Sequence, residues 1–467
     1  MKINGYNNRS LPKRSRRIHF IGIGGSGMGG IAEVMHHIGY AVSGSDLHKN
    51  SMTRRLTDLG IKILFGHSAE HVHGCDVAVI SSAVQEDNPE VQAARARRIP
   101  VVPRAEMLGE LMRFSIGIAI AGTHGKTTTT SLIASILAEG NLDPTFVIGG
   151  RLNSVGTHAG LGTGEYLVAE ADESDASFLF LKPVMAVVTN IDADHIRTYN
   201  NDFNQLRQTF LNFLQQLPFY GLAVLCIDDP VIEGILPQLT KPKITYGFSS
   251  KADIRAIPLE QKQGQTHFKV LRDQTGWLDV TLNLPGKHNV HNALAAIAIA
   301  YEVGVPETVI CKALQAFSGI SRRFQMHKIL RSKGDILHID DYGHHPREIA
   351  AVLQAIRDGW PGRRIVLAFQ PHRYTRTHDL FDDFVEVLSQ VEVLLLLEVY
   401  AAGETVIADA TGESLCQAIN ASKKVKPRFV EQPEQLPDIL LPMLRDQDIL
   451  LTLGAGSIGT IAATLFQ

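Results

Sequence analysis

Residues 115–130 read SIGIAIAGTHGKTTTT: an apolar run, a glycine-rich turn, a lysine and four threonines. The apolar run has the length and composition of a buried strand. The segment after the turn, TTTTSLIASILAEG, has the periodicity of an amphipathic helix that ends near Gly140. A strand, a glycine-rich turn and a Lys-Thr pair at a helix start are typical of a loop whose backbone N–H groups wrap phosphate oxygens. The stretch therefore predicts a nucleoside-triphosphate site on an α/β sheet.

The side chains of this phosphate loop (residues 122–128) have distinct expected roles. Lys126 would neutralise the terminal phosphates, and the hydroxyl of Thr127 would reach Mg²⁺. The loop is shorter than the common G-x-x-x-x-G-K-T form, because Ile120 stands where its first glycine would be. The residues that we expect to bind ATP here are Gly122, Thr123, His124, Gly125, Lys126, Thr127 and Thr128.

A second glycine-rich turn lies near the N-terminus, where residues 22–27 read GIGGSG. It follows the apolar run RIHFIGIG and precedes a helix-like segment, and Asp46 ends the next strand-like run. This layout is typical of a dinucleotide fold, in which glycines let the backbone approach a diphosphate at a helix N-terminus. The residues alone leave open a nicotinamide cofactor, another diphosphate, or a turn without a ligand.

Short apolar runs alternate with helix-like segments along the whole chain of 467 residues. Such Val/Ile/Leu-rich runs are typical of central strands in parallel sheets that are covered on both faces. A chain of this length has room for about three domains. We therefore predict an α/β protein with a Rossmann-like N-terminal domain, a central parallel sheet like that of P-loop NTPases, and a Rossmann-like C-terminal domain. The expected bounds are 1–110, 111–322 and 323–467.

The composition excludes several classes of protein. Lys and Arg number 45 against 48 Asp and Glu, a balance that argues against a general binder of nucleic acid or membrane surfaces. The four cysteines are far apart in sequence, so we expect neither disulfides nor a zinc–cysteine site, and a reducing cytoplasm is the predicted location. No apolar run approaches the roughly 18 residues of a spanning helix. The basic segment 9–17 lacks the features of a secretory signal and is expected to be a solvated leader.

The ordered set of motifs along the chain resembles the Mur ligases of bacterial cell-wall synthesis. The resemblance covers nearly everything from Arg17 onward. Two small departures, DHIRTY for DHM-x-TY and NNDF where a Gly-Asp pair is common, remove no residue type that the chemistry needs. The motifs that carry it include GIGGSGMGGIAEVM, GTHGKTTTT, EADESD, TNIDADH, PGKHNVHNALAA, GISRRFQ, DDYGHHPREI and AFQPHRYTRT.

Within the family, the chain is most similar to members that use ATP to join L-alanine to the lactyl carboxylate of UDP-N-acetylmuramate through an acyl phosphate. The resemblance implies ATP and Mg²⁺ as cofactors, with Mn²⁺ as an alternative metal, and a monomer or homodimer without nucleic-acid or membrane partners. A sister ligase for a pre-formed peptide remains an alternative. The Lys126-Thr127 pair argues against a dehydrogenase, and Glu170 with His195 argues against a non-catalytic regulator.

The resemblance also assigns residues to the sugar nucleotide and the metal ions. Glu170 follows a strand-like run beside the phosphate loop, whereas Glu173 and Asp175 are expected to be solvated. His195 would hold a second Mg²⁺, although the residue alone favours a capping or core histidine. The implied metal ligands are Thr127, Glu170 and His195. The implied UDP-sugar residues are Gly24, Gly25, Ser26, Gly27, Met28, Asp46, His67, Ser81, Ser82 and Arg104.

The remaining implied residues concern adenine, the hinge and the amino acid. Asn289 and Asn292 would face adenine, although one of them is expected to be a helix N-cap. Arg373 and Arg376 are expected on one face of a first helical turn, aimed at the L-alanine carboxylate, with a structural salt bridge for one of them as the alternative. Arg323 and Asp341 would contact ATP, Tyr342 and His344 would close the amino-acid pocket, and the catalytic set would be Lys126, His195 and His344.

The histidines at 67, 71 and 73 have a spacing that resembles a metal site. We expect no zinc there. A solvated loop is the preferred interpretation of this segment, with His67 near enough to contact the nucleotide.

Overall fold

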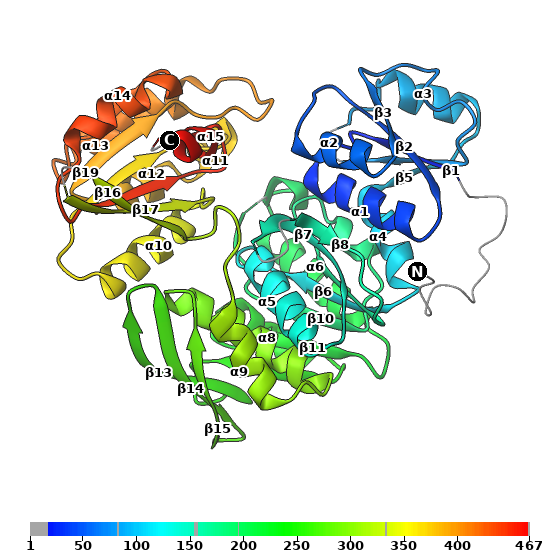
Figure 1. The fold of residues 1–467 in the computed structure, drawn as a ribbon, viewed down its shortest axis with the longest axis horizontal. Coiled ribbons are helices and arrows are strands. Elements are labelled where there is room, and N and C mark those ends of the chain that lie inside the picture. Colours follow the sequence, from blue (N-terminus) through cyan, green and yellow to red (C-terminus); the bar gives the residue numbers. More distant parts are fainter. Residues whose placement is uncertain (1–16, 82–83, 154–156, 195, 332–333, 466–467) are drawn as a thin grey trace. The chain divides into compact units, whose positions relative to one another are not determined.

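The computed structural model describes residues 17–81, 84–153, 157–194, 196–331 and 334–465 (Figure 1). Strands and helices alternate along the chain and form three sheets, which confirms the α/β class. The N-terminal and central sheets belong to one compact unit. The C-terminal sheet belongs to a second, together with the segments Glu260–Thr266 and Leu282–His288. Within the described segments, no helix is both long and apolar enough to cross a membrane.

The N-terminal sheet is parallel throughout, with the strand order β3-β2-β1-β4-β5. The order reverses between β1 and β4, and ligands of such sheets bind beside the reversal at the carboxyl ends of the strands. The turn after β1 leads into α1 at that edge, as predicted for a Rossmann-like domain. The elements are β1 (Arg17–Ile21), α1 (Ser26–His37), β2 (Ala41–Asp46), α2 (Ser51–Asp58), β3 (Lys62–Phe65), β4 (Val77–Ile80), α3 (Pro89–Ala96), β5 (Val101–Pro103) and α4 (Arg104–Met112).

The central sheet has the strand order β15-β14-β13-β12-β11-β10-β6-β9-β7-β8. The strands from β12 to β7 are parallel, and β8 is antiparallel to β7. The strands are β6 (Ile116–Ala121), β7 (Thr145–Leu152), β8 (Thr157–Gly160), β9 (Tyr166–Glu170), β10 (Met185–Val188), β11 (Leu222–Cys226), β12 (Lys243–Gly247), β13 (Ile254–Lys262), β14 (Gln265–Arg272) and β15 (Thr275–Leu282). The helices are α5 (Lys126–Glu139), η1 (Ser177–Phe180), η2 (Ile196–Tyr199), α6 (Phe203–Gln215), α7 (Pro230–Ile235), η3 (Leu236–Gln238), α8 (Lys287–Glu302) and α9 (Glu307–Ala316).

Helix α5 follows the phosphate loop and ends at a Gly140 C-cap, as predicted. It is not amphipathic, however, because nearly every side chain from Thr127 to Leu137 is buried. The sheet strands β7 and β9 cover one side of the helix and α9 packs against it as well. Burial on all sides fixes the start of α5, which carries the residues of the phosphate loop.

The C-terminal sheet has the strand order β16-β17-β21-β18-β19-β20 and is parallel except for the edge strand β16. The strands are β16 (Gln325–Arg331), β17 (Gly334–Asp341), β18 (Ile365–Phe369), β19 (Val393–Leu397), β20 (Arg428–Val430) and β21 (Ile449–Leu453). The helices are α10 (Pro346–Gly359), α11 (Tyr374–Asp379), α12 (Phe381–Leu388), η4 (Ala408–Ala410), α13 (Gly412–Ala421), η5 (Pro433–Gln435), α14 (Leu436–Leu440), η6 (Leu441–Met443) and α15 (Ile458–Thr464).

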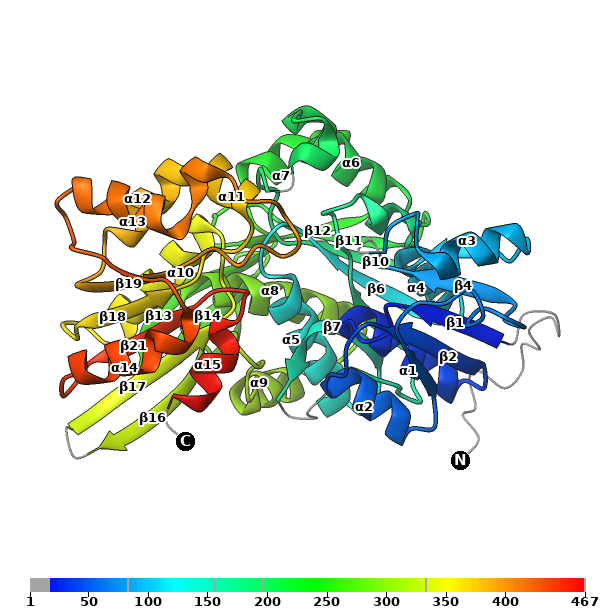
Figure 2. The same ribbon diagram turned by 90° about the horizontal axis from the view of Figure 1, so that it is seen from above.

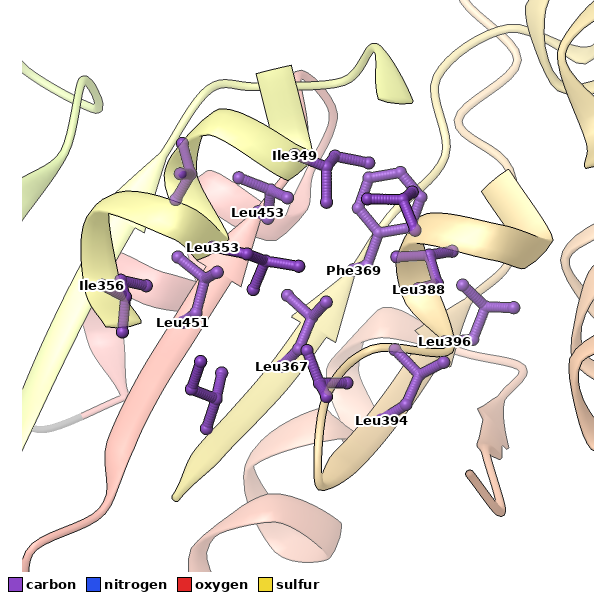
Figure 3. Close-up of a cluster of buried hydrophobic side chains, with 14 of the residues drawn as sticks. Ile349, Leu353, Ile356, Leu367, Phe369, Leu388, Leu394, Leu396, Leu451 and Leu453 are labelled. Carbon is purple, nitrogen blue, oxygen red and sulfur yellow. The ribbon is translucent and has the colours of Figure 1, made fainter. Parts of the chain in front are cut away.

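Both faces of the C-terminal sheet are covered, because its strands are apolar on both sides. Figure 2 shows α12 and α13 on one face and α14 and α15 on the other. Leu367 and Leu451 point into the layer on the side of α12 and α13, where they meet Ile349 and Leu353 of α10 (Figure 3). The alternating neighbour Leu450 points into the second layer, as the period of a strand requires. Unbroken apolar runs therefore mark a doubly covered strand.

Leu451→Ala is expected to lower the free energy of unfolding of the C-terminal unit by about 2–5 kcal/mol, because it leaves a cavity in a fully buried layer. The measurement is urea unfolding followed by Trp360 fluorescence in a Trp277→Phe background, since Trp360 packs against this layer. Val406→Ala, at a side chain that is 66% exposed, is the control and should leave the midpoint nearly unchanged. Equal midpoints for both variants would contradict the assignment of this core.

A second expectation concerns His338 in β17, which is buried and lies 2.9 Å from the Thr452 hydroxyl. Burial lowers its pKa to about 4, whereas an unfolded histidine titrates near about 6.5. The unfolded chain therefore binds a proton first, and stability is lost as the pH falls from 6.5 towards 4. The burial of Asp341 acts in the opposite direction, because it raises the pKa of that carboxyl to about 6.

Comparison with His338→Gln isolates the histidine, since Asp341 is present in both proteins. Between pH 7 and pH 5 the variant is expected to lose about 2 kcal/mol less unfolding free energy than the parent. The measurement is the same urea titration at the two pH values. A parallel pH dependence of the two proteins would show that His338 does not resist protonation.

Candidate active site

The phosphate loop leaves no space for side chains at its glycines. Gly122 and Gly125 have φ angles of +126° and +85°, which disfavour other residues. A Cβ at Gly122 would lie 2.1 Å from the Thr189 hydroxyl oxygen, and one at Gly125 would lie 2.5 Å from Oδ1 of Asn292. Asn190, two residues after the end of β10, holds the loop: its Oδ1 accepts from the His124 N–H at 2.8 Å. Asn190 is not among the ATP-site residues predicted from the sequence.

Lys126 begins α5 and its ammonium group turns back into the loop. Nζ donates to the Gly122 carbonyl at 2.6 Å and to both carboxylate oxygens of Glu173, at 2.9 and 2.8 Å. Burial opposes the charge, but the carboxylates of Glu173, Asp172 and Glu170 raise the pKa of Lys126. The prediction that Glu173 is solvated is wrong: it is buried, because the loop after β9 folds over the lysine. Asp175 is exposed, as predicted.

The loop after β9 is fixed to the segment that follows His195. The Tyr199 hydroxyl donates to the Glu173 carbonyl, and the Thr198 hydroxyl donates to the Ser174 carbonyl at 2.6 Å. Glu170 ends β9, and its Oε1 accepts from the Gly149 N–H at 2.6 Å. His195 itself lies outside the described residues. The hydroxyl and carboxylate oxygens of Thr127, Glu170 and Asp172 are donors of the kind that a hard cation such as Mg²⁺ prefers, so the described residues fit that ion.

Asn289 and Asn292 are buried on α8 and lie close to the phosphate loop. Oδ1 of Asn292 accepts from the Thr129 hydroxyl at 3.1 Å, and its amide N–H donates to Asn289 at 3.3 Å. The expectation that one of the two is an N-cap is wrong, because α8 already begins at Lys287. The pair therefore connects α8 to α5, with an amide edge beside the loop.

Side chains from two other segments contact the glycine turn of the N-terminal sheet. The Gly24 N–H donates to Oδ2 of Asp46 at 2.8 Å, so this carboxylate binds the backbone of the turn. A Cβ at Gly27 would lie 2.7 Å from Nη1 of Arg104, so this arginine crosses the start of α1. Nη2 of Arg104 lies 3.4 Å from Asp172, which links this turn to the loop after β9.

The other predicted sugar-nucleotide residues have different surroundings. A Cβ at Gly22 would lie 3.5 Å from the Ser81 hydroxyl oxygen, so Ser81 borders the turn. Gly25 is the N-cap of α1, Ser26 is its first residue, and the Met28 side chain is buried in the core. Ser82 lies outside the described residues.

The interpretation of the histidine segment as a solvated loop without a carboxylate is wrong. His67 and His71 are half-buried, and Nδ1 of each lies within 2.9 and 3.1 Å of the same oxygen of Glu90. Glu90 comes from α3, whose first turn folds back against the ends of β2 and β3. His73 is exposed. The sequence separation of 19 to 23 residues hid this carboxylate.

In the C-terminal unit, Asp341 is the buried last residue of β17, and His344 lies partly buried three residues further on. Asp341 accepts from the N–H groups of Phe324 and Gly343 at 2.7 and 2.6 Å, and burial raises its pKa to about 6. Burial lowers the pKa of His344 to about 3, so its imidazole is neutral near pH 7. The Tyr342 ring lies 5.7 Å from that imidazole and 5.0 Å from the Arg323 guanidinium.

Arg373 and Arg376, the two arginines predicted to bind the L-alanine carboxylate, do not share a first helical turn. Helix α11 begins at Tyr374, and Arg373 is its N-cap with a φ of +72°. Arg373 is half-exposed and lies 3.8 Å from Glu404, which keeps open a structural ion pair for this residue. Arg376 is buried and donates to the His372 carbonyl at 3.2 Å. The His372 ring lies 5.6 Å from that of His344, a neighbour that the sequence analysis did not identify.

Three domain models of one family match the chain: the Mur ligase family catalytic domain over residues 17–115, the Mur ligase middle domain over 120–300, and the Mur ligase glutamate ligase domain over 322–456. The chain belongs to the Mur ligase family. The UDP-N-acetylmuramate–L-alanine ligases of Methylobacillus flagellatus and Methylococcus capsulatus are each 60% identical to it, over 97% of this chain and 96% of theirs.

Solved structures of Mur ligases have the same fold. The UDP-N-acetylmuramate–alanine ligase of Thermotoga maritima is 29% identical, with a TM-score of 0.82 over 96% of this chain and 98% of that one. A murein peptide ligase from Psychrobacter arcticus has a TM-score of 0.70 at 23% identity, over 97% and 98%. The three-domain α/β architecture predicted from the sequence is that of this family.

In this Mur ligase, Lys126→Met is expected to abolish ATP turnover and to destabilise its unit by about 3–5 kcal/mol, because Glu173 is left buried without a cation. Adding Glu173→Gln should restore most of the stability but none of the turnover. The measurements are phosphate release and urea unfolding followed by Trp277 in a Trp360→Phe background.

Lys251→Met is the matched control, because Lys251 forms a solvent-exposed ion pair with Glu233 in the same unit. It should change neither property appreciably. Turnover by folded Lys126→Met at the parent rate, or equal stability of the single and double variants, would contradict the role given to the buried pair.

Proposed function

We infer that this Mur ligase uses ATP to join L-alanine to the lactyl carboxylate of UDP-N-acetylmuramate, forming ADP and phosphate in the synthesis of peptidoglycan precursors. The observation that carries this conclusion is the 60% identity, over nearly the full length, to curated relatives named for that reaction. We further propose a cytoplasmic location and a monomer or homodimer.

The lactyl carboxylate is a poor acyl donor because its oxygen is a poor leaving group, and the proposed chemistry converts that oxygen into part of a phosphate. One carboxylate oxygen attacks the γ-phosphorus and ADP leaves, which makes an acyl phosphate. The amine of L-alanine then attacks the acyl carbon, and phosphate leaves with that oxygen. Lys126 supports the first step, because its buried positive charge faces the phosphate loop. Thr127, Glu170 and His195 would hold Mg²⁺ or Mn²⁺, which supplies further neutralisation of phosphate charge.

The sugar nucleotide would lie at the glycine turn of the N-terminal sheet. Gly24, Gly25 and Gly27 present backbone at the start of α1, and Arg104 adds a positive charge there. The remaining residues of the proposed site are Ser26, Met28, Asp46, His67, Ser81 and Ser82. Adenine would contact Asn289 and Asn292, whose amides offer both a donor and an acceptor.

L-Alanine would bind in the C-terminal unit, with its carboxylate at Arg376 and Arg373. Nδ1 of His344 lies 3.1 Å from the Tyr342 carbonyl, so this nitrogen donates and Nε2 is left as an acceptor. Since burial holds the pKa of His344 near 3, the imidazole would bind the amine by accepting a hydrogen bond rather than by removing its proton. Tyr342 would border this pocket, and Arg323 and Asp341 would act on the ATP side.

Isotope transfer tests the reaction directly. With heavy oxygen in the lactyl carboxylate, the label is expected in released phosphate during turnover with ATP and L-alanine. Without L-alanine, hydroxylamine is expected to trap a hydroxamate of the muramyl acid when ATP and Mg²⁺ are present. Label in AMP, with release of pyrophosphate, would refute this mechanism. A tripeptide that replaces L-alanine efficiently would instead identify a peptide-adding sister ligase.

A further inference from the structure

Glu90, in the first turn of α3, is a fully buried carboxylate that four side chains surround. The Ser45 hydroxyl and Nε2 of His19 each lie 2.8 Å from its Oε2. Nδ1 of His67 and Nδ1 of His71 lie 2.9 and 3.1 Å from its Oε1. Burial opposes ionisation, but the hydrogen bonds from His19, His67 and Ser45 lower the pKa of Glu90 to about 2. We call these five residues the Glu90 cluster.

The charge on Glu90 determines the direction of every hydrogen bond in the Glu90 cluster. An ionised carboxylate can only accept, so each of its four partners must donate. His67 and His71 therefore carry a proton on Nδ1, and Nε2 is the nitrogen that each has left for another partner. The Ser45 hydroxyl donates its hydrogen bond to Glu90, and this contact fixes the rotamer of the Ser45 side chain. Glu90 thus sets the orientation of the Ser45, His67 and His71 side chains and determines which nitrogen of each histidine is protonated.

The Glu90 cluster is joined to the glycine turn through the backbone of Ser45. The Ser45 carbonyl accepts from the N–H groups of Gly22 and Ile23, at 2.9 and 3.0 Å. The next residue, Asp46, holds the Gly24 N–H with its side chain and the Gly66 N–H with its carbonyl, the latter at 2.9 Å. One buried carboxylate is therefore connected both to the turn and to the segment that carries His67.

His67 lies just beyond the carboxyl end of β3, beside the carboxyl end of β2. This is the edge of a parallel sheet at which ligands bind. Its side chain is partly exposed there, in contrast to His19 on the interior side of Glu90. A fixed Nε2 at this place can accept a hydrogen bond from an N–H or O–H group of a bound nucleoside.

We propose that Glu90 is a positioning residue of the sugar-nucleotide site: it fixes Ser45 behind the glycine turn and turns Nε2 of His67 towards the uridine. The proposal rests on the function proposed above, and Glu90 acts through its neighbours without touching the substrate. It differs from a merely structural role because it requires the loss of Glu90 to affect one substrate and not the others.

Glu90→Gln keeps the shape of the side chain but turns one of its two ends into a donor that faces other donors. The expected result is a roughly tenfold higher KM for UDP-N-acetylmuramate, with kcat and the KM values for ATP and L-alanine within about twofold of the parent. Calorimetry with UDP alone and the full-length protein should give a similar loss of affinity. Unchanged values for UDP and the sugar nucleotide in a folded variant would overturn the proposal.

Glu33→Gln is the matched control. Glu33 is another buried carboxylate of the N-terminal sheet's helices, paired with Arg55 at 2.7 Å and outside the Glu90 cluster. It should lower the melting temperature without a selective effect on the sugar nucleotide. A Glu90→Gln variant that raised all three KM values together, as general destabilisation would, contradicts the positioning role.

Two more variants identify the route of the effect. Glu90→Gln combined with His67→Ala is expected to raise the KM for the sugar nucleotide by less than the product of the single effects, because both changes remove the same interaction. Multiplicative effects would show that Glu90 does not act through His67. If Glu90→Gln does not fold, Ser45→Ala takes its place, since it removes one hydrogen bond to Glu90, and an increase of twofold or more in that KM is expected.

The same assays separate this inference from the proposed function. If the parent protein forms the alanyl product and Glu90→Gln behaves like the parent, only the positioning role is lost. If the parent protein binds no UDP and forms no product, the proposed function itself fails.

Discussion

The buried ammonium group of Lys126 is the charge on which the carboxyl edge of the central sheet depends. It meets both oxygens of Glu173 and attracts Asp172 and Glu170, all from the end of β9 and the loop that follows it. Burial opposes ionisation of Asp172, but Lys126 and its hydrogen bonds to Ser174, with Arg104, lower its pKa. Carboxylates therefore outnumber the cation at this edge. In the proposed reaction, divalent ions would bind to these extra carboxylates. The ions would then offset the repulsion between the carboxylates and the phosphates, which are both negatively charged.

The two glycine turns are built in the same way. Each lies after a parallel strand and before a helix, and in each a side chain would collide with a neighbour that holds the turn. Thr189 and Asn292 occupy that space at the phosphate loop, and Asp46 and Arg104 occupy it at the N-terminal turn. Because Arg104 also approaches Asp172, the N-terminal turn is joined by an ion pair to the segment that surrounds Lys126. A nucleotide diphosphate at the first turn would thus share its cation with the acidic loop of the second.

The sequence predicted those features whose signals are local. The strand and helix around Lys126, the parallel sheets and the Rossmann-like order follow from apolar runs and glycine turns, which act within a few residues. Other features depend on contacts that no local pattern contains. EADESD holds several carboxylates, and only the fold selects Glu173 for the lysine. Arg373 precedes its helix because its backbone has a positive φ of +72°, which spacing does not reveal.

Two groups of buried charges whose partners could not be read from the sequence lie where ligands are proposed to bind. Removing charged groups from water costs free energy that their mutual attraction only partly offsets, and apolar replacements of similar volume are often as stable. The Lys126–Glu173 pair and the Glu90 cluster nevertheless occupy interior positions at the ligand-binding edges of their sheets. Packing alone does not account for an ammonium group or a carboxylate at these points. What each provides is a fixed direction: Lys126 faces the phosphate loop, and Glu90 leaves a defined nitrogen of His67 at the edge of the N-terminal sheet. Orientation that is set before a ligand arrives reduces the ordering cost of binding, which is the physical reason to retain such costly groups.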